Sequence, residues 1–171
     1  MFRQSCGCIE IGGLGIEDIE RNTAFSLESI QMPCPSDLNA QGKILVDHYA
    51  NVIIERSKQL SQVSTYLAVD GYFSKQSFVD QLMNHTNVEL ISKLRKDANL
   101  RYLYKGPKRK GRGRPKKYDG KVDPKNIDKR RFRWIYQDQD VIIFQAKVWS
   151  WSLKRTINVA YVEFIFFKLP D

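Results

Sequence analysis

The sequence has few of the residues that build covalent or metal-bound frameworks. Its 171 residues include three cysteines, Cys6, Cys8 and Cys34, and two histidines, His48 and His85. The cysteines leave one without a partner, and Cys6-x-Cys8 lacks the spacing of a zinc knuckle. The sequence therefore supports neither a disulfide framework nor a zinc site, and it offers no combination of residues typical of a Ser, Cys or His nucleophile. Reduced cysteines fit a cytosolic compartment.

Long hydrophobic runs are also missing. No window approaches the roughly 18 continuous apolar residues of a membrane-spanning helix, and the N-terminal residues lack the apolar core of a signal peptide. The basic stretch of the chain is too rich in glycine and proline to form an amphipathic membrane helix. We therefore expect no membrane partner.

Acidic residues are scarce in one segment, and this scarcity explains the charge of the whole chain. The formal net charge is +9. Residues 101–133 contain fifteen Lys and Arg against three Asp, a net charge of +12, so the other residues together carry −3. A block with this excess repels itself unless a polyanion neutralises it, which indicates nucleic acid. We expect double-stranded DNA as the partner and a cytoplasmic, nucleoid-associated location.

The N-terminal part of the chain has the periodicity of an α/β protein. Residues 9–20 and 23–31, separated by Arg21-Asn22, are typical of a β-hairpin. A helical stripe over residues 36–60 follows, and then come a strand, a helix and a further strand at 88–94. The predicted order is ββαβαβ.

The remainder of the chain divides into a basic stretch and a strand-rich stretch. Glycine and proline are spread among the charges of the basic stretch, which predicts a loop or arm. Beyond it, residues 132–136, 141–149 and 157–167 predict a β-meander. We therefore divide the chain into three parts: a core of residues 1–100, a basic loop of residues 101–131 and a β-rich segment of residues 132–171.

One carboxylate has the position of a functional group. Asp70 follows the apolar run Tyr66-Leu67-Ala68-Val69, Gly71 permits a turn, and Ser74 suits the N-cap of a helix over residues 75–84. Ligands and metals bind at the carboxyl ends of strands in open α/β sheets. Asp70 is therefore a candidate catalytic and metal-binding residue, and the alternative is an aspartate that only caps a turn.

The basic stretch contains a motif that resembles an AT-hook, Lys110-Gly111-Arg112-Gly113-Arg114-Pro115-Lys116-Lys117. Gly113 has no Cβ, so the backbone between two arginines can lie flat in a narrow A·T minor groove, whose negative potential attracts arginine. The alternative is a loop that contacts phosphates only, or one that serves solubility. The candidate DNA-binding residues are Lys105, Lys108, Arg109, Lys110, Arg112, Arg114, Lys116 and Lys117.

Several motifs in this order resemble bacterial insertion-sequence DDE transposases, in the branch with a β-insertion in the ribonuclease-H-like core. The similar segments are Val69-Asp70-Gly71-Tyr72-Phe73-Ser74-Lys75, Leu90-Ile91-Ser92-Lys93-Leu94-Arg95 with Asp97-Ala98-Asn99-Leu100-Arg101, and Tyr161-Val162-Glu163-Phe164. Together with the order ββαβαβ, the resemblance covers nearly the whole chain. The resemblance implies an α/β (α+β) fold with a mixed ribonuclease-H-like sheet, flanking helices and a β-rich insertion. It also implies that three carboxylates hold Mg²⁺ for phosphodiester cleavage and strand transfer, with Asp70 as the second of them.

The first and third carboxylates of that family have no counterpart here. No acidic residue precedes the hairpin among residues 1–8, and Glu163 lies in a predicted strand rather than in the family's final helix. Asp18, Asp47 and Asp80 are the possible replacements, each with an ordinary surface or turn role as the alternative. We therefore expect a transposase fragment that is truncated at both ends and catalytically incomplete. Loss of the central strand would leave two unpaired edges, so either the sheet closes without that strand or the fragment folds poorly.

Two other functions stay open at this point. One is a stand-alone DNA-binding or regulatory protein that occupies transposon ends, as a homo-oligomer or together with full-length transposase. The other is an RNA-binding protein, which is disfavoured because the sequence shows no aromatic signature of an RNA-recognition sheet. A divalent-metal requirement would separate the transposase fragment from the DNA-binding protein.

Overall fold

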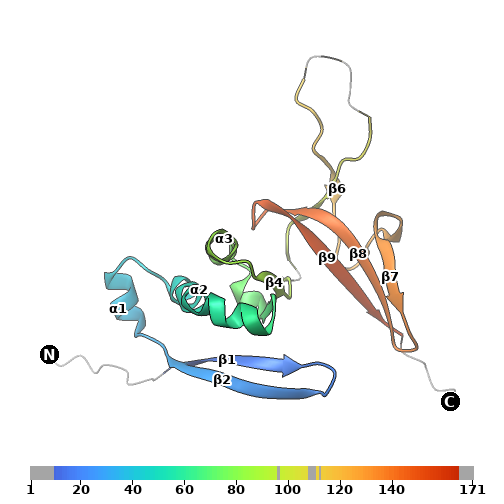
Figure 1. The fold of residues 1–171 in the computed structure, drawn as a ribbon. Coiled ribbons are helices and arrows are strands. Elements are labelled where there is room, and N and C mark those ends of the chain that lie inside the picture. Colours follow the sequence, from blue (N-terminus) through green and yellow to red (C-terminus); the bar gives the residue numbers. More distant parts are fainter. Residues whose placement is uncertain (1–9, 96, 108–110, 112, 166–171) are drawn as a thin grey trace.

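The computed structural model describes residues 10–95, 97–107, 111 and 113–165. The chain forms a mixed α/β structure in which a helical part comes first and a strand-rich part follows (Figure 1). The first part comprises β1 (Ile11–Asp18), β2 (Thr23–Gln31), α1 (Pro35–Ala40), α2 (Leu45–Val63), β3 (Tyr66–Val69), the 3₁₀ turn η1 (Gly71–Phe73), α3 (Gln76–His85) and β4 (Glu89–Ser92). The second comprises β5 (Leu100–Leu103), β6 (Tyr118–Lys121), the 3₁₀ turn η2 (Lys129–Arg131), β7 (Arg133–Gln137), β8 (Val141–Ser150) and β9 (Arg155–Phe164).

The predicted N-terminal hairpin is confirmed. β1 and β2 pair in antiparallel register from Ile11 opposite Gln31 to Asp18 opposite Thr23. Asn22 makes the turn with a φ of 49°, a left-handed conformation that asparagine tolerates better than most residues. The hairpin is attached to α2 by an ion pair between Glu28 and Arg56.

The helix predicted over residues 36–60 is two helices. Gly42 follows α1 with a φ of +67°, a conformation that suits glycine and ends the helix. α2 then starts afresh, and the Asp47 carboxylate accepts the backbone N–H of Ile44 at 3.2 Å. The apolar stripe was correctly placed, but the break at Gly42 was not predicted.

The strand–turn–helix unit around Asp70 is present, with one correction to its helix cap. β3 and β4 are parallel, and α3 connects them. Ser74 does not cap α3, which begins at Gln76 after Lys75. The intervening residues form η1, in which the Tyr72 N–H donates to the Asp70 side chain and the Phe73 N–H to the Asp70 carbonyl. The Ser74 hydroxyl instead lies 2.7 Å from that of Ser92, at the end of β4.

The core of this first part is built by the helices. Its buried members, Val46, Ala50, Ile53, Phe78 and Leu82, all come from α2 and α3. Leu14 of the hairpin and Leu67 and Leu90 of the parallel pair pack against them. The hairpin and the β3–β4 pair nevertheless remain two separate two-stranded sheets in the part of the chain that the structure describes. The alternative in which one sheet closes without a central strand is therefore not what forms.

The second part is a five-stranded sheet centred on β8. The predicted meander is confirmed, since β7, β8 and β9 pair consecutively and antiparallel. β5 and β6 also belong to this sheet, with the order β6-β5-β8-β7. Both strands fall within residues 101–131 or at their border, where the sequence predicts a loop throughout. The basic stretch is therefore largely the connection of a β-hairpin.

A second core lies on one face of this sheet. Ala146 and Val148 of β8 pack against Leu100 and Tyr102 of β5, and the loop residues Val122 and Phe132 complete the cluster. The sheet contacts the first part through an ion pair between Asp80 of α3 and Arg155 of β9. Within the described residues, no helix is both long and apolar enough to cross a membrane.

Candidate nucleic-acid interface

The sheet has an exposed face opposite its core. Directly opposed residues of antiparallel strands point to the same face, and the registers place Arg101 beside both Lys121 and Trp149, Arg133 beside Gln145, and Lys147 beside Asn158. The four cations and Asn158 are exposed, while Trp149 and Gln145 are half-buried. We call this surface the open face and define it by Arg101, Lys121, Arg133, Gln145, Lys147, Trp149, Thr156 and Asn158.

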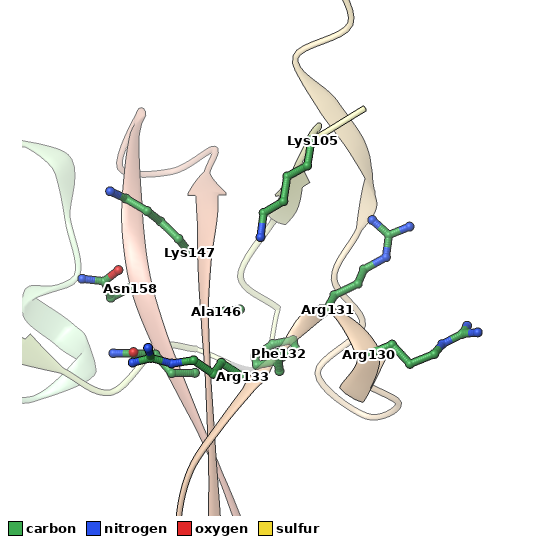
Figure 2. A pocket seen from close by; sticks show the side chains of 9 residues that line it. Lys105, Arg130, Arg131, Phe132, Arg133, Ala146, Lys147 and Asn158 are labelled. Carbon is green, nitrogen blue, oxygen red and sulfur yellow. The ribbon is translucent and has the colours of Figure 1, made fainter. Parts of the chain in front are cut away.

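A hollow opens where two strands share one edge of β8. β7 pairs with residues 142–145 and β5 with residues 148–150, so neither is in register with Ala146 or Lys147. The space left between the two strands has a volume of about 350 Å³. We call it the cationic slot (Figure 2), and its lining is Lys105, Arg130, Arg131, Phe132, Arg133, Gln145, Ala146, Lys147 and Asn158.

The lining of the cationic slot holds five cations and no carboxylate. In Figure 2 the side chains of Arg133, Lys147 and Asn158 extend to one side, and those of Arg130 and Arg131 extend to the other. A wall of one charge sign concentrates the electrostatic potential in a hollow and favours an anion there. The slot therefore has the charge and the polar donors to hold phosphate groups.

Two of the five cations are already held by aspartates. Arg131 binds Asp119 at 2.8 Å and Asp128 at 3.2 Å, and Arg130 binds Asp128 at 3.1 Å. Hydrogen bonds from Lys116 and then Arg131 lower the pKa of Asp119, and a hydrogen bond from Arg130 lowers the pKa of Asp128. Both carboxylates therefore stay charged and keep the two arginines in place.

The other three cations of the slot have no compensating charge. Lys105, Arg133 and Lys147 make no ion pair with any described residue. They come from three different elements, namely the loop after β5, the start of β7 and the middle of β8. The fold thus gathers uncompensated positive charge that is spread along the sequence.

Within the predicted basic stretch of residues 101–131, the loop proper is the connection between β5 and β6, residues 104–117, and from here on the name basic loop refers to it alone. Its described parts rise away from the sheet (Figure 1). A 3.0 Å hydrogen bond from the Tyr104 N–H to the Lys117 carbonyl closes its base. Lys116 binds Asp119 at 2.7 Å and lies 4.8 Å from the centre of the Tyr104 ring. Gly113 has a φ of +154°, an extended backbone that favours glycine.

The predicted DNA-binding residues are only partly brought together. Lys105 lines the cationic slot, and Arg114, Lys116 and Lys117 are exposed along the loop. Lys108, Arg109, Lys110 and Arg112 lie outside the described residues. Sequence reasoning missed the slot residues beyond the loop, including Lys147 and Asn158, although the period-2 pattern of β8 and β9 placed them on one face of a sheet.

Aromatic rings adjoin the open face at the end where β5 and β6 pair. Tyr118 lies 5.7 Å from Trp149 and 5.9 Å from Trp151, measured between ring centroids. The Arg101 guanidinium lies 5.2 Å from the Trp151 ring. Half of the Trp151 surface is exposed. This cluster gives the face a π surface beside its cations.

Asp70 occupies the position that the sequence predicts, at the carboxyl end of β3. It is exposed, and its Oδ1 accepts the Tyr72 N–H at 3.2 Å. A Cβ on Gly71 would come within 2.8 Å of the Lys93 carbonyl, so the close approach of the two strand ends requires glycine. The hollow beside Asp70 has a volume of about 540 Å³ and is lined by Asp70, Gly71, Tyr72, Ser74, Lys75, Lys93, Leu94 and Arg95.

The residues around Asp70 do not fit Mg²⁺. Hard cations take several oxygen ligands, whereas this hollow offers one carboxylate and three cationic side chains, those of Lys75, Lys93 and Arg95. Among the described residues, no three His, Cys, Asp or Glu side chains gather in a way that could hold a metal. The Asp70 side chain caps η1.

The other acids considered as ligands serve elsewhere. Asp18 pairs with Arg21, and Asp80 pairs with Arg155. Asp47 caps α2 and accepts a hydrogen bond from Gln81 at 2.8 Å. Glu163 binds Lys129 at 2.6 Å. Each carboxylate has a structural partner of its own away from Asp70.

The chain matches no family model, no curated protein and no solved structure.

Proposed function

We propose that the protein binds duplex DNA, with the cationic slot and the basic loop as its contact surface. The single observation that carries this proposal is the slot, where five cations and no carboxylate line one hollow. DNA presents one phosphate charge per about 1.7 Å of helix axis, so several cations of the slot can bind phosphates of one duplex at the same time. The basic loop adds further cations at the edge of the same sheet.

The chemistry of the surface favours contacts to phosphates over contacts to bases. Lysine and arginine side chains bind phosphate oxygens without reading the sequence. The Arg-Gly-Arg-Pro motif adds a preference for A·T-rich DNA, because a narrow minor groove attracts arginine. Binding therefore combines a general electrostatic part with a modest A·T preference.

We propose further that the chain comes from a DDE-transposase-like protein and does not cleave DNA by itself. The resemblance around Asp70 supports the first statement. The donor set beside Asp70 supports the second, because one carboxylate among three cations does not hold two metal ions. The same donor set favours the second candidate function, a DNA-binding or regulatory protein without catalysis.

Salt titration of DNA binding tests the surface. We expect the double variant Arg133→Gln/Lys147→Gln to lower the slope of log K against log salt concentration by about 2, since removing one cation that binds a phosphate lowers this slope by about 1. The matched control is Lys58→Gln/Lys125→Gln, which removes two exposed cations away from the slot. Equal slopes for the two double variants would exclude the slot as the contact surface.

Plasmid nicking tests the absence of catalysis. Purified protein with Mg²⁺ or Mn²⁺ should bind a supercoiled A·T-rich plasmid and leave it intact, and Asp70→Ala should bind equally well. Cleavage by the natural protein that disappears in Asp70→Ala would show that the chain has a working metal site.

A further inference from the structure

The outer edge of β9 has the properties of a pairing surface. β9 pairs with β8 over ten residues without a register shift. In the described part of the chain, no strand pairs with the other edge of β9 between Arg155 and Glu163. Residues 156–162 there read Thr-Ile-Asn-Val-Ala-Tyr-Val, with neither charge nor proline.

Such an edge is unusual for a strand left in solvent. Natural sheets protect their edges with lysine, proline, bulges or very short strands, because free N–H and C=O groups pair with other strands. β9 is long and regular, and it is rich in β-branched residues that favour strands. Its only charged residues, Arg155 and Glu163, lie at its two ends.

We propose that β9 pairs antiparallel with β9 of a second copy of this chain, with the two Val159 residues directly opposite each other. A two-fold axis perpendicular to the sheet relates the strands in such a pair. Directly opposed residues of the two strands must then point to the same face of the sheet. The alternative registers therefore differ from this one by steps of two residues.

The register centred on Val159 matches side chains of the same kind. Ile157 comes opposite Tyr161 of the second copy, and both are half-buried on the core side. Thr156 comes opposite Val162 on the exposed side. Apolar and β-branched residues opposed in this way stabilise antiparallel pairs.

The same register also matches charge. Arg155 comes opposite Glu163 of the second copy, and each is already paired within its own chain, with Asp80 and Lys129 respectively. The four side chains then alternate in sign along the interface. Centring the pair on Asn158 would instead oppose Arg155 to Tyr161, and centring it on Ala160 would oppose Glu163 to Ile157. Of these three registers, only the one centred on Val159 leaves no charge opposite an apolar side chain.

The dimer would form one continuous sheet of two halves. Because the axis is perpendicular to the sheet, both open faces lie on the same side, with the two cationic slots related by two-fold symmetry. Duplex DNA has the same approximate symmetry in its backbone. The pairing itself does not depend on DNA and stands apart from the proposed function.

Sedimentation equilibrium of the full chain tests the pairing with two variants of equal mutational load. Thr156→Lys/Val162→Lys places like charges opposite each other twice across the dimer, and Thr156→Lys/Val162→Glu places opposite charges there. Within one chain the two positions are about 20 Å apart along the strand, too far to interact strongly. The comparison therefore isolates the contact between copies.

We expect the natural chain and the lysine–glutamate variant to dimerise, and the dissociation constant of the lysine–lysine variant to be at least about tenfold higher than that of the lysine–glutamate variant. Circular dichroism of both variants checks that they fold. A natural chain that stays monomeric at every concentration would overturn the proposal, as would equal dissociation constants for the two variants. DNA binding by a monomeric chain would leave the proposed function intact and refute only the dimer.

Discussion

The two parts of this molecule hold their strands in opposite ways. In the N-terminal region, residues 10–95, four strands form two separate sheets, and helices α2 and α3 provide the five buried residues of the main hydrophobic cluster. In the C-terminal region, residues 97–165, five strands form one sheet around β8. Two-stranded sheets are marginal on their own. Side-chain packing on helices therefore organises the first region, and a continuous backbone ladder organises the second.

The difference is open to measurement because the tryptophans are segregated. Trp134, Trp149 and Trp151 all lie in the C-terminal region, and the two long helices lie in the N-terminal region. Tryptophan fluorescence therefore reports on the sheet, and far-ultraviolet circular dichroism is dominated by the helices. Unfolding followed by both signals shows whether the regions behave as one cooperative unit.

The largest effect is expected from Phe78→Ala. Phe78 is fully buried between α2 and α3, and truncating a buried phenylalanine costs about 3–5 kcal/mol. The helical transition in a urea titration should move to much lower denaturant, with a much smaller shift of the tryptophan transition. Equal shifts of both transitions would show that the two regions unfold together.

Val148→Ala is the converse experiment. Val148 is fully buried in the core of the sheet, and removing two methyl groups there costs about 2 kcal/mol. The tryptophan transition should move, and the helical transition should stay near its original midpoint. If the helical signal moved as far, the sheet would be supporting the helices.

Asp80→Asn should increase the difference between the unfolding midpoints of the two regions. Asp80 binds Arg155 across them, and loss of this partly exposed charged pair should cost about 1 kcal/mol. The two transitions should separate further in the variant than in the natural chain. Asp37→Asn, at an exposed position of α1 without an ion pair to any described residue, is the control. An unchanged separation would mean that this pair does not couple the regions.

Acid should produce the smallest effect, because the groups involved are exposed. Hydrogen bonds hold the pKa of Asp119, Asp128 and Asp138 below the ordinary value of 3.8 in the folded sheet. A carboxyl group whose pKa is lower in the folded than in the unfolded state stabilises the fold at pH values above its unfolded-state pKa. This stability is lost as the pH falls through the folded-state pKa.

The N-terminal region has one such carboxylate, Glu28, whose pKa is lowered by its hydrogen bond to Arg56. Lowering the pH from about 7 to about 3 should therefore lower the midpoint temperature of the tryptophan transition more than that of the helical transition. Thermal unfolding at the two pH values measures both midpoints. A larger loss in the helical signal would contradict this ranking.

Local features of the fold were predictable from the sequence. The apolar run before Asp70 and the glycine after it define a strand that ends at an exposed turn, and the structure has both. The alternation on both sides of Asn22 defines the hairpin in the same way. Each of these features is set by residues that are neighbours in the chain.

Features that depend on distant partners were not predictable. β5 reads as the start of a basic loop, because its strand character comes from pairing with residues 148–150 of β8. The cationic slot exists because β7 and β5 approach the same edge of β8 from different parts of the chain. Its charges could be counted in the sequence, but their meeting point follows from three strand registers.

The closed base of the basic loop has a consequence for how this protein can change. The hydrogen bond between the Tyr104 N–H and the Lys117 carbonyl closes the basic loop at its base, so both ends of the loop are fixed to the sheet. The entropic cost of closing a loop grows only with the logarithm of its length, and each doubling of the length costs roughly 0.6 kcal/mol. Insertions or deletions within the basic loop can therefore add or remove positive charge without changing the structure of the sheet.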